Sequence, residues 1–445
     1  MNVSAPTANL ANEPTTPKTP QEIRHSRRKV VISGMLGNGL EWYDYALYGH
    51  MSVVFATLFF TFGADADPTF ALILTYLTFA AGFVSRPLGA VLFGRLGDKY
   101  GRKRALTASM ILMAIPTGCI GLLPTYEAIG YAAPILLVII RILQGLSLGG
   151  AFSGSMSYVV EHADPKARAR TGSVTMLSLV IGFLVGSLVS TLAASSMDHD
   201  SFMSWGWRLP FFVGVGIGFV GFWIRNHGDE SPVYTEAKAA GTLSQSPVKE
   251  AFTKEPRKMF QGFAFYMFVT IPFYILAIYM IGYTQKHLGF SADDALQINS
   301  LAMVAMFLPI WFSAQAADKY GRRPVLMVTI VAMMLVTYPA FMMMQSGIYW
   351  QVLLAQAAMA FILGSYLAPI PALLVELFPT RIRYTGMSLS YNFCAIVGGF
   401  TPTIAELLIR ETGDKTSIMY LMLGAGVFSF VALAMYKDNF REKLA

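Results

Sequence analysis

Two carboxylic acids lie inside the first long apolar stretch of the chain, where charged groups are rare. Glu41 and Asp44 are three residues apart in the segment NGLEWYDYALYGH, which covers residues 38–50. Residues three or four apart share one face of a helix, so both acids lie on a small and polar face that also carries Asn38 and Tyr48. An unpaired acid at the middle of a bilayer costs about 2.5–3.5 kcal/mol on insertion scales. The pattern therefore predicts a partner or a polar path beside this face.

Two arginines inside later apolar stretches are candidate partners. Arg86 lies in the second stretch and Arg141 in the fourth, and each is as costly as the acids when it is alone. A carboxyl that a guanidinium stabilises in one conformation and leaves in another can bind and release a proton. We predict a proton-coupling site made of these arginines with Glu41 and Asp44, in which Asp44 is favoured for the proton and Glu41 for packing or coupling. Two alternatives stay open: static ion pairs that fix helix packing, and contact of Arg141 with a substrate carboxylate.

The composition predicts that these residues are positioned by membrane helices. The chain has 445 residues, of which 55% are hydrophobic and 13% charged, against about 25% charged in an average soluble domain. A membrane helix needs about 20 mostly apolar residues. The sequence therefore predicts an all-α membrane protein with twelve transmembrane helices in two six-helix bundles. The expected spans are 30–60, 68–93, 105–123, 133–162, 171–194, 207–225, 258–283, 295–316, 325–345, 350–377, 386–409 and 417–436.

The distribution of basic residues predicts the orientation of these spans. If the N-terminus is cytoplasmic, the inside segments hold 27 of the 33 Lys and Arg residues, and the outside loops hold three, namely Lys286, Arg410 and Lys415. This asymmetry fits the positive-inside rule. We therefore expect a disordered cytoplasmic tail over 1–29, a bundle over 30–225, a cytoplasmic central loop over 226–257, a second bundle over 258–436 and a cytoplasmic tail over 437–445.

The two halves of the chain repeat each other. GRLGDKYGRKRAL at 94–106 returns as AQAADKYGRRPVL at 314–326, with a constant offset that relates Asp98 to Asp318 and Arg102 to Arg322. A second echo relates VVEHADPKARARTG at 159–172 to LVELFPTRIRYTG at 374–386. A repeat of six spans predicts two related bundles around a central path.

The repeated loop, together with RILQGLSLGG at 141–150, resembles the major facilitator superfamily over residues from about 30 to 436. Further segments resemble its metabolite:proton symporter branch, whose members carry proline and betaine, citrate, α-ketoglutarate, shikimate and related solutes. These segments are EWYDYALYG at 41–49, SRPLGAVLFGRLGDKYGRK at 85–103, WGWRLPFF at 205–212 and GGFTPT at 398–403.

The resemblance implies proton-coupled transport by alternating access, with loops that clamp the two bundles at the cytoplasmic side. The residues expected in this gate are Asp98, Arg102, Glu161, Arg168, Asp318, Arg322, Glu376 and Arg381. Candidate substrate contacts are the family-pattern residue Gln144, aromatic residues that suit a quaternary ammonium group, and two amides inside apolar spans. With Gln144 they are Tyr48, Tyr274, Tyr279, Asn299 and Asn392.

The expected substrate is a small polar metabolite of the proline/betaine type, and a di- or tricarboxylate of the citrate or α-ketoglutarate type is the alternative. The first half looks most like proline/betaine carriers, whereas TPTIAELLIRETGDKTS at 401–417 looks more like citrate-type carriers, and Ala151 stands where the family usually has an acid. A receptor that binds a solute without carrying it is a further alternative. The residues form no nucleotide loop, metal-ligand spacing or nucleophile arrangement, so we expect neither an enzyme nor a cofactor, and nucleic acid is a poor explanation of the net charge of +7. We expect a monomer in a plasma membrane, the inner membrane of a bacterium, with both termini cytoplasmic.

Overall fold

The structure is a computed structural model, and parts of the chain are left out of its description. It describes residues 35, 38–39, 41–63, 67–100, 102–149, 151–161, 163–226, 247–379 and 382–442. Inside the helices, only the backbone is described for 94–100, 102–106, 151, 154, 158, 221, 224–226, 247 and 384. Across these residues the secondary structure is helical, without strands.

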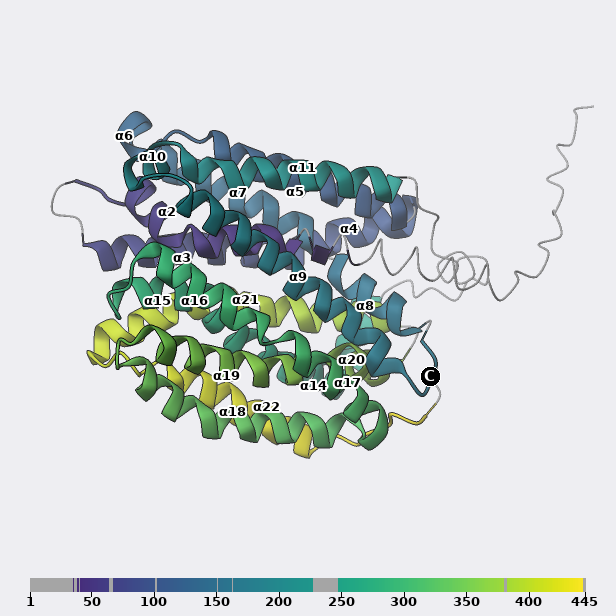
Figure 1. Ribbon diagram of the computed structural model, residues 1–445. Coiled ribbons are helices and arrows are strands. Elements are labelled where there is room, and N and C mark those ends of the chain that lie inside the picture. Colours follow the sequence, from purple (N-terminus) through teal and green to yellow (C-terminus); the bar gives the residue numbers. More distant parts are fainter. Residues whose placement is uncertain are drawn as a thin grey trace, which may run out of the picture.

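The first half of the chain forms the upper layer of Figure 1, coloured purple to teal. Its first span is helical over 41–50 and continues as α2. The further elements are α2 (Ser52–Phe59), α3 (Pro68–Val84), α4 (Arg86–Tyr100), α5 (Arg102–Leu122), α6 (Tyr126–Ile129), α7 (Ala132–Leu148), α8 (Ala151–Glu161), α9 (Arg168–Ser195), α10 (His199–Ser204), η1 (Gly206–Arg208) and α11 (Leu209–Asn226).

The second half forms the lower layer of Figure 1, coloured green to yellow. It is preceded by α13 (Pro247–Lys254), a helix inside the polar stretch that we expected between the halves. The elements that follow are α14 (Pro256–Tyr274), the π-helical turn η2 (Ile275–Tyr279), α15 (Met280–Lys286), α16 (Ala292–Val304), α17 (Phe307–Tyr320), α18 (Arg322–Met344), α19 (Tyr349–Leu367), α20 (Ile370–Leu377), α21 (Arg383–Thr412) and α22 (Met419–Ala434).

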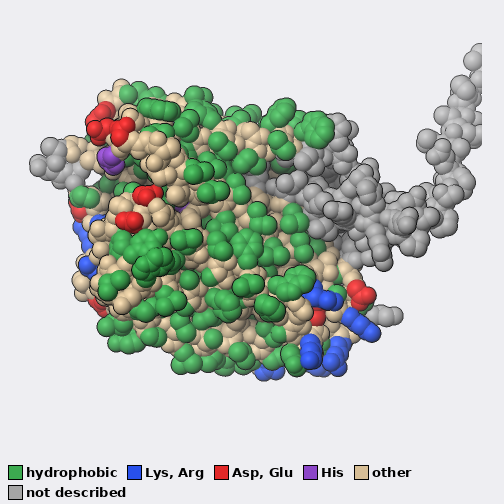
Figure 2. Space-filling view, viewed as in Figure 1, with side chains coloured by type: hydrophobic (Ala, Val, Ile, Leu, Met, Phe, Trp, Pro, Cys, Tyr) green, Lys and Arg blue, Asp and Glu red, His purple; other side chains and the backbone are tan. Residues whose placement is uncertain are grey.

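The helices are suited to a membrane by length, composition and surface. Among the described residues, seven helical segments are long and apolar enough to cross a bilayer, and four more are apolar but shorter. Figure 2 shows apolar side chains over most of the visible face, with charged groups gathered toward its two ends. With the first span, these segments make the predicted twelve-helix architecture, six spans in each half. The all-α membrane fold is confirmed.

The internal repeat extends from the loops into the helices themselves. The second and eighth spans are interrupted at Ser85, after α3, and at Ala305, after α16. The fourth and tenth spans are interrupted at Gly149, after α7, and at Pro369, before α20. Both pairs of breaks keep the offset that relates the two gate loops, so the halves share their helix breaks as well as their loop sequences.

The two halves meet along a few helices that line the centre. The helix α3 packs against α21, α9 packs against α16 and α17, and α8 packs against α20. The seventh span is the most enclosed: 94% of the apolar window within Pro256–Lys286 is buried, against 39% within Arg322–Met344. We refer below to the α8 end and the α10 end of the molecule, at the right and the left of Figure 1.

Small residues bring α7 close to the second span. A Cβ added at Gly145 would overlap the carbonyl oxygen of Gly82, and one added at Gly149 would overlap the backbone at Arg86 and Ala90. Close approach of this kind is the usual role of glycine between membrane helices. It sets the two arginines of the first half, Arg86 and Arg141, on neighbouring helices beside the first span.

Candidate functional site

The polar face of the first helix is buried against other helices of the first half. Asn38 donates from its Nδ2 to the carbonyl of Thr175 (2.9 Å) and to the hydroxyl of Ser178 (2.9 Å), both on α9. Glu41 and Asp44 are 4% and 2% exposed. The expected burial of both acids is therefore present, and each is paired with one of the two arginines.

Asp44 lies at the centre of a network that stays within the first half. Its Oδ2 accepts from Nη1 of Arg141 (2.9 Å), and its Oδ1 accepts from Thr117 (2.7 Å) and from Nε2 of Gln144 (2.8 Å). Arg141 also donates to Oε1 of Gln144 (2.6 Å), and its guanidinium lies 4.3 Å from the ring centre of Tyr48. Three donors stabilise the charged carboxylate in this conformation.

Glu41 belongs to a second network that reaches the other half. Its Oε1 accepts from Nη2 of Arg86 (3.1 Å), and the same nitrogen donates to the hydroxyl of Tyr391 on α21 (2.9 Å). Arg86 is the first residue of α4 and follows the helix break at Ser85. Ser85 donates to the carbonyl of Ile142 (2.9 Å), which ties this break to α7.

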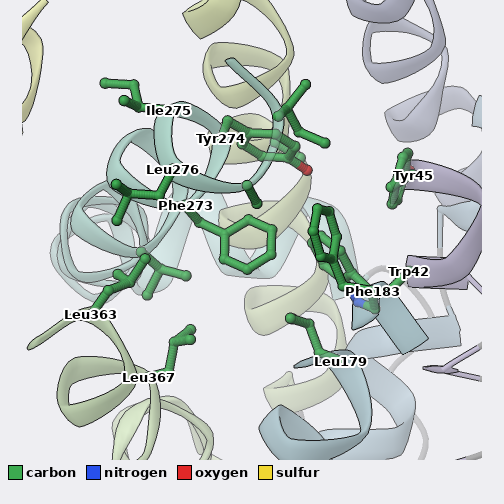
Figure 3. Packing of buried hydrophobic residues seen from close by; sticks show 14 of the residues in the cluster. Trp42, Tyr45, Leu179, Phe183, Phe273, Tyr274, Ile275, Leu276, Leu363 and Leu367 are labelled. Atoms are coloured by element: carbon green, nitrogen blue, oxygen red, sulfur yellow. The ribbon is translucent and has the colours of Figure 1, made fainter. Parts of the chain in front are cut away.

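Aromatic rings from both halves pack together beside the seventh span (Figure 3). Trp42 lies edge-on to Tyr45 (5.3 Å between ring centres) and to Phe273 of α14 (5.1 Å). Phe83 of α3 meets Tyr274 (5.3 Å). Trp42 is not among the predicted site residues. Its spacing from Tyr45 and Gly49 is the signal that indicates a second face of that helix, directed at the seventh span.

The other predicted substrate residues make defined contacts in this conformation. Nδ2 of Asn299 donates to the carbonyl of Leu276 in η2 (2.6 Å), and Nδ2 of Asn392 donates to the carbonyl of Gly149 (2.9 Å). Both amides thus bind backbone carbonyls where a helix is irregular. Tyr48 donates to the carbonyl of Thr75 (2.8 Å). Tyr279 lies toward the α10 end and donates to Oε2 of Glu406 (2.7 Å).

Glu406 was missed by the sequence reading although its signal is the same as that of Glu41. It is an acid within an apolar span and is 1% exposed. Besides Tyr279, it accepts from Nζ of Lys286 (2.7 Å) and contacts Nε2 of His287 (3.1 Å). All four residues belong to the second half, so this cluster closes the end of the seventh span against α21.

The expected gate residues that the structure describes gather at the α8 end, and all of them except Arg322 contact the other half directly. Asp318 accepts from the backbone N–H groups of Ala169 (2.9 Å) and Arg170 (3.0 Å). These are first-turn donors of α9 that lack partners within the helix, so a residue of the second half caps a helix of the first. We call the contacts at this end the latch.

Ion pairs complete the latch. Glu376 accepts from Arg168 of the other half (3.4 Å) and from Nη2 of Arg322 (2.9 Å), while Glu161 accepts from Arg383 of the other half (3.0 Å). Arg381 was predicted to belong to the gate, whereas Arg383 was not. Arg381 and the side chains of Asp98 and Arg102 lie outside the described residues.

Comparisons with known proteins agree with the architecture. A family model described as "Sugar (and other) transporter" matches residues 30–441. The chain is 30% identical to the proline/betaine transporter of Salmonella typhimurium, over 94% of this chain and 85% of that protein. It is 31% identical to the glycine betaine/proline/ectoine/pipecolic acid transporter OusA of Dickeya dadantii, over 94% of this chain and 84% of that protein.

Solved structures share the fold at lower identity. The proton:xylose symporter XylE, a major facilitator superfamily protein bound to 6-bromo-6-deoxy-D-glucose, matches with a TM-score of 0.75 and 19% identity, over 95% of this chain and 98% of that one. The xylose transporter XylE from E. coli in a partially occluded inward-open conformation matches with a TM-score of 0.74 and 18% identity, over 94% and 100%.

Proposed function

Because the chain belongs to the sugar (and other) transporter family of the major facilitator superfamily, we propose that it is a proton symporter that imports a proline/betaine-type osmolyte. Membership of this family makes the chain a multi-pass membrane transporter and not an enzyme. The substrate class rests on two relatives named for proline and betaine, which match 94% of the chain at 30% and 31% identity.

The observation that carries the proton coupling is the buried network of Asp44. This carboxylate accepts hydrogen bonds from Thr117, Arg141 and Gln144 and is buried in this conformation. Loss of the Arg141 contact when the central path opens would leave a buried negative charge, which is costly, and a proton removes that cost. Asp44 is therefore the proposed proton carrier, and Glu41 with Arg86 couples it to the second half.

Alternating access would then proceed by rocking of the two bundles, 30–225 against 258–436. The latch supports this view because its partners come from different halves: Asp318 caps α9, and Glu376 pairs with Arg168. The repeat assigns matching positions in the first gate loop to Asp98 and Arg102. The latch end is the cytoplasmic side in this proposal, with both termini at that side of a bacterial inner membrane, and the monomer is the working unit.

Substrate contacts are proposed where the two halves meet. Tyr274 belongs to the aromatic cluster with Phe83, and Tyr48 stacks beneath Arg141. The other four candidates form hydrogen bonds with protein groups in this conformation, and a solute would bind them only by replacing those partners. They are Gln144, Tyr279, Asn299 and Asn392.

Uptake into proteoliposomes tests the proposal. Purified protein is reconstituted, and labelled proline, glycine betaine, citrate and α-ketoglutarate are compared with and without an imposed pH gradient. We expect accumulation of proline or glycine betaine above the external concentration only when the outside is acidic. Accumulation of citrate alone would contradict the substrate class. Uptake that ignores the pH gradient would contradict the coupling, and binding without any uptake would favour a receptor.

A further inference from the structure

Arg86 is a buried cation whose hydrogen-bonding capacity is only partly used. Its side chain is fully buried, and its Nη2 holds both Glu41 and Tyr391. Among the described residues, neither its Nε–H nor its Nη1 group has a hydrogen-bond partner. Unmet donors on a buried charge are unfavourable, so this position stands out as one that a ligand would complete.

Arg322, a buried arginine of the latch, is an example of a guanidinium whose nitrogens all have hydrogen-bond partners. Arg322 is 1% exposed and donates from all three nitrogens: Nε and Nη2 to Glu376, and Nη1 to Asp318 and the carbonyl of Ala317. Arg86 is buried as deeply, but two of its three nitrogens have no hydrogen-bond partner in the part of the chain that the structure describes. The contrast indicates that Arg86 does more than fix the packing of helices.

We propose that Arg86 is the anchor for the carboxylate of the transported solute, a role that rests on the transport function proposed above. A guanidinium and a carboxylate form two parallel hydrogen bonds. In Arg86, Nε–H and Nη1 each lie beside Nη2, so a carboxylate that displaces an oxygen from Nη2 gains a two-point contact. The displaced oxygen belongs to Glu41 or to Tyr391.

The surroundings of Arg86 suit the rest of a zwitterion. Its guanidinium carbon lies 4.7 Å from the ring centre of Tyr391, 5.3 Å from that of Phe83 and 5.8 Å from that of Tyr45. The ring of Tyr45 packs against Trp42, and Trp42 packs against Phe273. Aromatic faces attract quaternary and protonated amines. A solute with a carboxylate and an ammonium a few bonds apart would place the first on Arg86 and the second against these rings.

The same geometry links solute binding to the movement of the halves. Tyr391 belongs to α21 of the second half, and its hydroxyl holds Arg86 of the first. A carboxylate that takes the place of this hydroxyl removes a contact between the halves. Glu41 neutralises Arg86 when the solute is absent.

Paired ligands that differ only in charge test the anchor. Binding of labelled glycine betaine to the purified protein is measured in competition with unlabelled glycine betaine and with its amide, which lacks the carboxylate. The parent is expected to prefer the carboxylate by about tenfold or more, the range of a charge-assisted contact. Arg86→Gln is expected to lose this preference, and Arg86→Lys to keep part of it. Arg168→Gln, which removes a latch guanidinium, is the matched control and keeps the full preference.

A second variant, Tyr391→Phe, and a second ligand, α-ketoglutarate, separate failure of the anchor from failure of the proposed substrate class. Tyr391→Phe removes the competing hydroxyl and is expected to bind glycine betaine severalfold more tightly, whether or not Arg86→Gln can be purified. If the parent binds α-ketoglutarate and not glycine betaine, the osmolyte class is wrong, and α-ketoglutarate binding that is weakened in Arg86→Lys and lost in Arg86→Gln still supports the anchor. A parent that binds the amide as well as glycine betaine, or an Arg86→Gln protein with an unchanged preference, overturns the anchor and leaves the osmolyte class intact.

Discussion

The two acids of the first helix are three residues apart, yet they belong to networks of different reach. Asp44 contacts Thr117, Arg141 and Gln144, all within the first half. Glu41 contacts Arg86, which in turn holds Tyr391 of the second half. Rocking of the bundles breaks a network across the interface directly, whereas a network within one bundle is lost only through a change inside that bundle, such as the proposed separation of Arg141 from Asp44. The Asp44 network therefore suits a proton site, and the Glu41–Arg86 network suits a contact that changes when the second half moves.

The largest effect is expected from Asp44→Asn. The substitution keeps the shape of the side chain but removes the group that binds the proton. We expect accumulation driven by a pH gradient to be abolished, while exchange of labelled for unlabelled solute at equal pH continues. Both rates are measured in proteoliposomes loaded with solute.

Glu41→Gln tests whether the two acids have different roles in transport. It changes the network that crosses the interface, so we expect it to slow both exchange and accumulation and not to separate them. If Glu41→Gln abolishes accumulation alone and Asp44→Asn does not, the proton assignment is reversed. If both variants concentrate solute with the parent's pH dependence, the two acids are structural.

An intermediate effect is expected at the latch. Asp318→Ala removes the cap that the second half provides to α9, and loss of such a cap costs about 1 kcal/mol. The population open at the α8 end should rise by roughly fivefold, since a factor of ten corresponds to about 1.4 kcal/mol. Labelling of a single cysteine in the central path, from each side of the membrane, measures this ratio.

Asp198→Ala is the matched control for the latch. Asp198 accepts from the backbone N–H of Ser201 (2.9 Å) and caps α10 within its own half. Its loss should cost similar stability in α10 without a change in the labelling ratio. Equal shifts in the two variants would show that the ratio follows stability in general and not the contacts between halves.

The sequence was sufficient to find most of the charged residues of the site but not their pairing. Acids and arginines in apolar spans are visible as costly residues, which identifies Glu41, Asp44, Arg86 and Arg141. Which acid meets which arginine depends on the rotation of three helices, and that rotation is set by contacts such as Gly145 against Gly82. The constant offset between the two gate loops predicted the related halves, because an internal repeat keeps both loops and helix breaks.

The contacts between halves could not be predicted in detail because they join residues far apart in the chain. The cap of α9 by Asp318 uses backbone groups, which carry no signal in side-chain identity. Arg383 and Arg381 are two residues apart in the same basic segment, so composition does not distinguish them. Glu406 is different, because an acid within an apolar span could have been predicted as a buried group from the sequence. It lies far from the repeated motifs and was not included in the predicted site.

The smallest expected effect separates two buried asparagines that have the same chemistry. Asn392 donates to the carbonyl of Gly149 across the interface, and Asn299 donates to the carbonyl of Leu276 within the second half. A net contribution of about 1 kcal/mol is typical for one such hydrogen bond, so each alanine variant should lower the thermal stability by a similar amount. Only Asn392→Ala should also raise the fraction of molecules in which the halves have separated at the α8 end, by a few-fold. The cysteine-labelling ratio in parent, Asn392→Ala and Asn299→Ala protein measures this. Equal ratios in the two variants would mean that the Asn392 contact stabilises α21 alone, and the distinction between contacts within and across the halves would then hold only for the charged residues.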